Sequence, residues 1–254
     1  MTDIAHAARL AAEAPCDGPD GPSGSALAAA LRHGGLLEAS LTLEELFEAL
    51  VAIGKASLSA GRLFEGHVNA VKLLNLYAPG QRPDGLLGIW GADGPDPVRI
   101  EGTVLRGQKL FASGADVLDH VVVTARNEDQ VQLLLFSRPQ LAGRLFPEEW
   151  QVSGMQATAS GRCNLDGLSP DHAVCIGGVG DYLIEPHFQG GVWRYGAVQL
   201  GGMQALTAIT AEQLQQRQQE KAPLQAMRLH RMVTACETAR LWLRQAAQAV
   251  ERPE

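Results

Sequence analysis

The sequence predicts an α+β protein in which helices come first, strands follow and helices return. In region 1–82, apolar residues such as Leu46 and Leu50 recur at helical spacing. In region 83–186 the pattern changes to short β-rich runs that are divided by glycines. Region 187–254 returns to long helical stretches. The lack of βαβ alternation argues against a doubly wound sheet, so we expect an N-terminal helical domain, a middle β-domain and a C-terminal helical domain.

The first region contains several recognisable helix boundaries. Pro15–Gly24 is rich in proline and glycine and predicts a loop, after which Ser25 opens a helix that a glycine pair closes. Thr42 and Glu45 have capping-box spacing, which predicts that a helix begins there. A break near Ser59–Gly61 divides the rest of this region into two helices.

The middle region predicts a small barrel or sandwich of short strands. A hairpin is expected where a polar turn, NEDQ, separates two β-rich runs, DHVVVTAR and VQLLLFSR. Further short strands are expected near residues 151–165 and 171–176.

The last region predicts two long helices, Gly191–Gln218 and Pro223–Val250. Together they carry more apolar surface than they can bury against each other. Large exposed apolar patches are rare on soluble monomers, so we expect a homodimer or homotetramer with these helices in the interface.

Composition excludes several classes of protein. The 254 residues are 46% hydrophobic and 19% charged, which is typical of soluble globular proteins, and the net charge of -7 argues against binding to nucleic acid or anionic lipid. No apolar run reaches the roughly 20 residues of a membrane span, and the N-terminus does not resemble a secretory signal. The four cysteines are scattered and the seven histidines form no HExxH, so we expect no metal site and a cytoplasmic protein with reduced thiols.

Two glycine-bearing stretches are candidates for a ligand site. Gly85–Pro97 predicts either a turn-rich connection or a loop whose backbone approaches a planar ligand, with Trp90 as a flat wall. In Lys109–Ala115, alternation along a strand would place Phe111 and Ser113 on one face. That face could line a flat ring and hydrogen-bond its edge, although a core phenylalanine beside a satisfied serine is the commoner arrangement.

Two further segments carry polar candidates. Trp150–Gly161 is rich in hydroxyl groups and predicts either a polar strand and turn or a ligand contact. Arg194 falls early in a helix, where it is either a clamp on an anionic group or a half-exposed arginine with a packed stem.

Taken in order, these segments resemble the acyl-CoA dehydrogenase family from about Ala26 to the C-terminus. The resemblance rests on three stretches, which are GQKLFASGADVLDHVVVTAR, WQVSGMQATASG and GGVWRYGAVQLGGMQAL. It implies an N-terminal helical domain, a middle β-barrel or sandwich domain, a C-terminal helical bundle of which only part is present, and FAD bound between them. By the same resemblance the flavin-facing residues are Ile89, Trp90, Phe111 and Ser113, whereas Thr158 and Arg194 lie on the side of the acyl-CoA substrate, Arg194 to within about a helical turn.

The resemblance implies α,β-dehydrogenation of an acyl thioester, with the electron acceptor left open. The chain departs from the family where T-E-P-G-A-G-S-D is replaced by WGADGPDP and where R-x-x-F-G is reduced to Arg217 and the residues after it. Relatives continue for roughly another hundred residues, which supply the glutamate base, whereas this chain ends at Glu254. We therefore assign no catalytic base and expect little dehydrogenase activity. Three hypotheses stay open: a truncated dehydrogenase, a flavin-dependent monooxygenase on the same fold, and a non-catalytic remnant that binds a ligand or partner.

Overall fold

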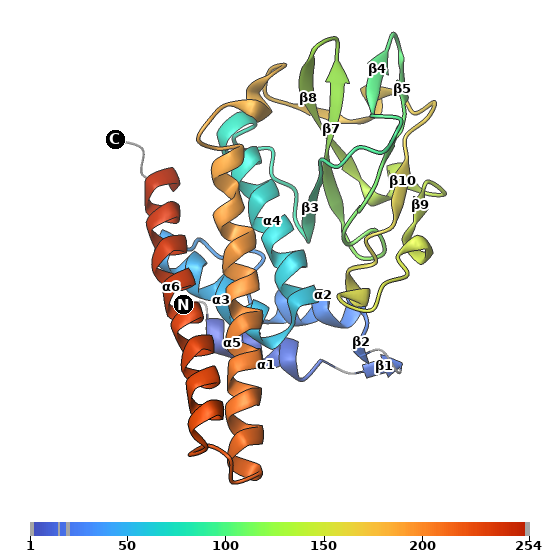
Figure 1. The fold of residues 1–254 in the computed structure, drawn as a ribbon. Coiled ribbons are helices and arrows are strands. Elements are labelled where there is room, and N and C mark those ends of the chain that lie inside the picture. Colours follow the sequence, from blue (N-terminus) through green and yellow to red (C-terminus); the bar gives the residue numbers. More distant parts are fainter. Residues whose placement is uncertain (1–2, 15, 19–20, 252–254) are drawn as a thin grey trace.

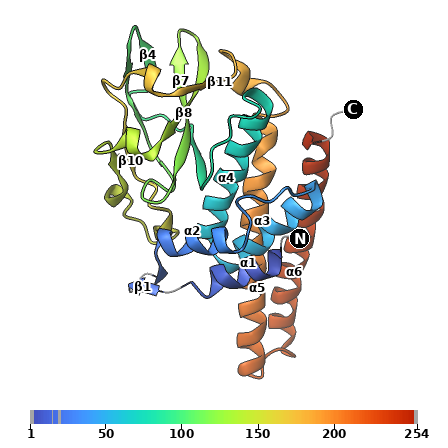
Figure 2. The ribbon, with the colours of Figure 1, turned by 180° about the vertical axis from the view of Figure 1, so that it is seen from behind.

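The computed structural model describes residues 3–14, 16–18 and 21–251. Long helices stand side by side, and the strands gather along one side of them (Figure 1). The view from behind shows that helix α4 lies between the strands and helix α6 (Figure 2). The helices are α1 (Ile4–Ala12), α2 (Gly24–His33), α3 (Leu43–Ala56), α4 (Leu58–Tyr77), α5 (Val192–Gln216) and α6 (Pro223–Glu251).

Two sheets make up the β region. The larger has the strand order β11-β8-β7-β4-β5 with β3 paired to β7 in parallel, and the smaller has the order β6-β10-β9. Strands β7 and β8 form the predicted hairpin, with His120 opposite Ser137. The strands are β3 (Leu87–Trp90), β4 (Arg99–Glu101), β5 (Val104–Arg106), β6 (Gln108–Lys109), β7 (His120–Asn127), β8 (Gln130–Ser137), β9 (Leu145–Phe146), β10 (Arg162–Asn164) and β11 (Val174–Ile176).

The local signals at helix starts act as their chemistry predicts. Thr42 Oγ1 accepts a hydrogen bond from the Glu45 backbone, and the Glu45 carboxylate accepts one from the Thr42 backbone, which confirms the capping box. The break between α3 and α4 falls at Ser57, ahead of the predicted Ser59–Gly61, because the Ser57 hydroxyl caps α4.

The predicted loop at Pro15–Gly24 needs a correction. Cys16–Gly18 (β1) pairs with Gly21–Pro22 (β2) as a short antiparallel ribbon, and α2 is then capped by Ser23, two residues before the predicted Ser25. Pro15, Pro19 and Asp20 lie outside the described residues.

Glycines bring α3 and α5 into backbone contact. A Cβ atom added at Gly54 would lie 2.3 Å from the carbonyl oxygen of Val198, and one added at Gly201 would lie 2.3 Å from that of Val51. Both distances are far below van der Waals contact, so these positions require glycine. The N-terminal helices and α5 therefore share one close-packed core.

His67 joins the helices to the sheet. Its Nε2 lies 2.9 Å from the Leu37 carbonyl oxygen, and its Nδ1 accepts a hydrogen bond from the Leu87 backbone N–H. Burial lowers the pKa of this imidazole to about 4, so the ring is neutral at pH 7 and its Nε2–H donates to Leu37. Among the described residues, no helix is long and apolar enough to span a bilayer.

Candidate functional site

Phe111 stands at the end of β6, in a turn. The predicted strand through Phe111 and Ser113 is wrong, because β6 ends at Lys109 and Phe111 has a left-handed backbone with φ 53°. That conformation costs a non-glycine residue about 1 kcal/mol. The Phe111 ring is nevertheless 62% exposed and meets another side chain, Trp150, edge-on at 6.2 Å. A strained and exposed aromatic ring is poorly explained by packing and is therefore a candidate ligand contact.

The turn is held by a second irregular segment, residues 155–161. Ala112 N–H donates to Gly161 O at 2.8 Å, and Gly114 N–H donates to Thr158 O at 2.6 Å. The expected strand near residues 151–165 is present only as β10, and Gln156–Thr158 forms a single turn of 3-10 helix. The two segments thus position each other through their backbones.

Three hydroxyl groups lie in a row between these segments. Thr158 Oγ1 is completely buried and lies 2.8 Å from both Met155 O and Ser160 Oγ, so its single hydrogen is shared between these two acceptors. Ser160 Oγ donates to Ser113 Oγ at 2.9 Å. The Ser113 hydrogen has only a long contact, 3.5 Å, to Phe111 O. Ser113 is therefore the hydroxyl of this row whose hydrogen a ligand could receive, and it lies beside the exposed Phe111 ring.

Trp90 fixes the backbone at Ser113. Its indole Nε1–H donates to Ser113 O at 3.0 Å, and its side chain is only 3% exposed. The prediction of a loop at Ile89 and Trp90 is wrong, because both lie in β3 and pair with β7 inside the sheet. The short apolar run LGIW is typical of a buried strand. Trp90 thus supports the candidate site from beneath and is not an exposed wall.

The rest of the glycine-bearing stretch is held by a buried lysine. Lys109 Nζ pairs with the Asp93 carboxylate and donates to Thr124 Oγ1 at 2.7 Å. Burial lowers the pKa of Lys109, but its pairing with Asp93 favours the charged form. This clamp joins the loop after Trp90 to β6, the strand that leads into Phe111.

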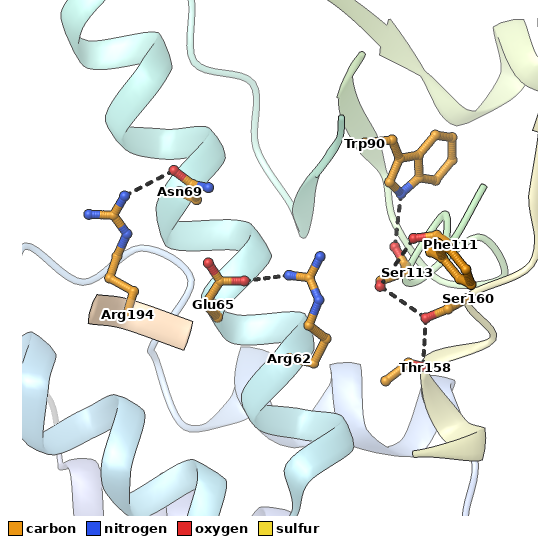
Figure 3. A network of polar contacts seen from close by, with 9 residues as sticks. All are labelled: Arg62, Glu65, Asn69, Trp90, Phe111, Ser113, Thr158, Ser160 and Arg194. Carbon is orange, nitrogen blue, oxygen red and sulfur yellow. Dashed lines mark hydrogen bonds and ion pairs between the residues drawn. The ribbon is translucent and has the colours of Figure 1, made fainter. Parts of the chain in front are cut away.

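Helix α4 contributes two charged residues that the sequence did not single out. Arg62 pairs with Glu65, and its guanidinium lies 5.9 Å from the centre of the Tyr195 ring. Figure 3 shows Arg62 reaching from α4 toward Trp90 and Ser113. Arg62 and Ser113 also line a small cavity of about 10 Å³ between α4 and the sheet. Arg62 and Glu65 are three residues apart, a spacing that predicts an ion pair on a helix. Nothing in the sequence indicates that Arg62 points toward Ser113.

Arg194 is not part of this group. It is 1% exposed, its Nη1 donates to Glu251 at 2.7 Å and its Nη2 donates to Asn69 at 3.1 Å. In Figure 3 it lies on the opposite side of α4 from Ser113. The structure therefore brings Ile89, Trp90, Phe111, Ser113 and Thr158 together and leaves Arg194 elsewhere.

Comparison with known proteins establishes the fold. No protein-family model and no curated protein sequence matches this chain. Among solved structures, dibenzothiophene monooxygenase (TdsC) from Paenibacillus sp. A11-2 matches with a TM-score of 0.77 and 18% identity over 98% of this chain and 75% of that one. Methanesulfinate monooxygenase MsuC from Pseudomonas fluorescens matches with a TM-score of 0.67 and 18% identity over 97% and 75% of the two chains.

A third match comes from a structure described as the electron transferring flavoprotein of Acidaminococcus fermentans. Its TM-score is 0.79 at 14% identity, over 97% of this chain and 77% of that one. The chain therefore has the fold of acyl-CoA dehydrogenase-like flavoenzymes, as the resemblance predicted. At these identities the likeness concerns the fold alone.

Proposed function

We propose that this chain binds a flavin against Phe111 and Ser113 and acts as a flavin-dependent monooxygenase. The observation that carries the proposal is the hydroxyl row that ends at Ser113, next to an aromatic ring held exposed by a strained backbone. An oxidised flavin is a planar ring with acceptor atoms on its edge, so the described side chains fit it: Phe111 offers an apolar face and Ser113 a donor. A bound flavin would supply the redox chemistry, passing electrons from a reductant to oxygen.

The chain's own residues have positioning roles in this proposal. Thr158 and Ser160 orient the Ser113 hydroxyl, and Trp90 holds the Ser113 carbonyl. The row contains hydroxyls and backbone carbonyls but no carboxylate, so it offers orientation rather than proton abstraction. Two of the structural neighbours are monooxygenases, and TdsC is known with FMN bound, which supports the same chemistry here.

Dehydrogenation of an acyl thioester is the second candidate. It needs a carboxylate to remove the α-proton. Glu65 is a buried carboxylate on α4, the helix that lies beside Ser113 (Figure 3). It forms an ion pair with Arg62. The family resemblance favours FAD for this reaction, whereas the TdsC structure favours FMN.

The test begins with binding. The full chain is titrated with FMN and with FAD, and quenching of flavin fluorescence is measured. Reduced flavin, oxygen and a trial substrate, indole or dibenzothiophene, are then supplied, and ¹⁸O incorporation from ¹⁸O₂ is followed by mass spectrometry. Incorporation supports monooxygenation. Oxidation of butyryl- or octanoyl-CoA with an artificial electron acceptor supports the second candidate, and failure to bind either flavin contradicts both.

We also propose that the chain forms a homodimer or homotetramer through α5 and α6. These helices carry large apolar side chains that are more than one third exposed. Exposed apolar side chains in such number mark an interaction surface. They are Val192, Tyr195, Met203, Leu206, Ile209, Leu224, Met227, Val233, Leu241 and Trp242.

A further inference from the structure

A cavity of about 380 Å³ lies between the segment that precedes α3 and helix α4. The start of α5 and the end of α6 close one side of it through Arg194 and Glu251. Its volume is in the range of small-molecule sites. Much of its wall is aliphatic, with contributions from Leu36, Leu41, Leu46, Val68, Val71 and Leu76.

The positive and negative charges of the side chains that line the cavity do not cancel. Three cations and two carboxylates line it, which leaves one positive charge in excess, although the whole chain has a net charge of -7. His67 adds no charge at pH 7, since its pKa is about 4. The charged residues are Lys72, Arg82, Arg194, Glu38 and Glu251.

The excess positive charge lies around Glu251, because this one carboxylate pairs with two cations, Lys72 and Arg194. Its Oε2 accepts from Lys72 Nζ at 2.7 Å, and its Oε1 accepts from Arg194 Nη1 at 2.7 Å and from the Trp193 indole at 3.2 Å. The Arg194 Nε–H is buried and has no hydrogen-bond partner. Burial lowers the pKa of Lys72, although its bond to Glu251 acts in the opposite direction. A second cation on one carboxylate, at a partly buried site, is stabilised by an added anion.

We propose that this cavity binds a small organic carboxylate, with its head group at Lys72 and Arg194 and its hydrocarbon chain along the leucine and valine wall. One excess charge matches a monoanion better than a phosphate dianion, and the aliphatic wall favours a ligand with an apolar body. The site is separate from the proposed flavin contact, because helix α4 stands between Arg194 and Ser113 (Figure 3). Binding is therefore expected with or without flavin.

The test uses hexanoate as the probe on the full chain. Its affinity is measured by isothermal titration calorimetry at pH 7, beside neutral hexan-1-ol and inorganic phosphate. Hexanoate is expected to bind at least about tenfold more tightly than either, since charge and chain both contribute. Equal binding of hexan-1-ol or of phosphate contradicts the proposal, as does the absence of hexanoate binding.

Two variants locate the site. Lys72→Met removes the excess charge but keeps the Arg194–Glu251 pair, so hexanoate affinity should fall at least about tenfold. Lys221→Met removes an exposed lysine at the turn between α5 and α6 and should leave the affinity unchanged. Val71→Phe fills the cavity without changing its charge and should also abolish binding, which decides the matter if Lys72→Met does not fold. Wild-type affinity in the folded Lys72→Met or Val71→Phe protein would overturn the assignment.

Discussion

Ser113 and Ser160 are 47 residues apart in the chain, and the hydroxyl of Ser160 donates to that of Ser113 at 2.9 Å. This bond joins the turn after β6 to the segment before β10. It is formed by two side chains of the hydroxyl row. It occupies the acceptor side of Ser113 and leaves its hydrogen available. The flavin proposal depends on that hydrogen.

Ser113→Ala is therefore expected to weaken flavin binding about fivefold, the value of one hydrogen bond of about 1 kcal/mol. Fluorescence titration of the purified variant measures the change. Thr103→Ala removes an exposed hydroxyl in the turn between β4 and β5 and is the matched control. Equal flavin affinity in Ser113→Ala and wild type would show that Ser113 does not contact the ring.

Phe111 permits a test that separates backbone strain from ligand contact. Glycine adopts φ 53° without the penalty that alanine bears, so Phe111→Gly should be more stable than Phe111→Ala by about 1 kcal/mol. Both variants lack the ring, so both should bind flavin more weakly than wild type and equally so. Urea unfolding gives the first comparison and flavin titration the second. A variant pair with wild-type flavin affinity would remove Phe111 from the site.

Removal of Asp93 and removal of Lys109 should lower the free energy of unfolding by different amounts. Lys109 is fully buried, whereas the Asp93 side chain is 25% exposed and can be hydrated. Asp93→Ala leaves a buried charge without its carboxylate and should cost about 3 kcal/mol or more. Lys109→Met leaves a carboxylate that water can reach and should cost less, about 1 kcal/mol. Chemical denaturation of both variants checks the order, and the reverse order would contradict this account of the clamp.

His67 should make the protein sensitive to acid. Its pKa is about 4 in the folded chain against 6.5 for an unperturbed histidine, so its contribution is complete above pH 6.5 and is lost as the pH falls toward 4. The shift corresponds to about 3 kcal/mol of unfolding free energy. His67→Gln should flatten the fall in stability between pH 7 and pH 4, and His33→Gln, at an exposed position, should not. An unchanged pH profile in His67→Gln would show that other groups dominate acid unfolding.

Assembly is tested on the exposed faces of α5 and α6. Leu206 and Trp242 are 63% and 72% exposed, so Leu206→Glu combined with Trp242→Glu should place two charges in the proposed interface and give a monomer. Light scattering after size-exclusion chromatography measures the mass. Val174→Glu changes an exposed apolar residue on β11 and should leave the assembly intact. A wild-type chain that is a monomer would contradict the proposal directly.

Local chemistry made several elements predictable. The capping box at Thr42 needs only residues three apart, and the β7–β8 hairpin needs only two β-rich runs around a polar turn. In both cases the residues that decide the structure are neighbours in the chain. The order of helices, strands and helices followed from the same kind of signal.

The candidate site was only partly predictable because distant contacts decide its shape. Periodicity placed Phe111 in a strand, but hydrogen bonds from Ala112 and Gly114 to residues 158–161 bend the chain there. The same applies to Arg194, which the sequence offered as a clamp on a ligand. Its partner is Glu251, at the far end of the following helix, and no local pattern connects the two. Ser160 lies in the hydroxyl-rich segment that the sequence singled out, but its contact with Ser113 was not predicted, and Arg62 was missed, because each acquires its role from a neighbour on another element.

The glycine contact between α3 and α5 has a consequence for synthesis on the ribosome. Gly54 leaves the exit tunnel long before Gly201, because the whole β region is translated between them. During that interval the face of α3 that carries Gly54 has no α5 to pack against, so the early helices are expected to remain loosely packed. The helices can pack closely only after α5 has been made. Nascent chains that stop before Val192 should therefore be cut by protease far more readily than chains that extend past Gln216.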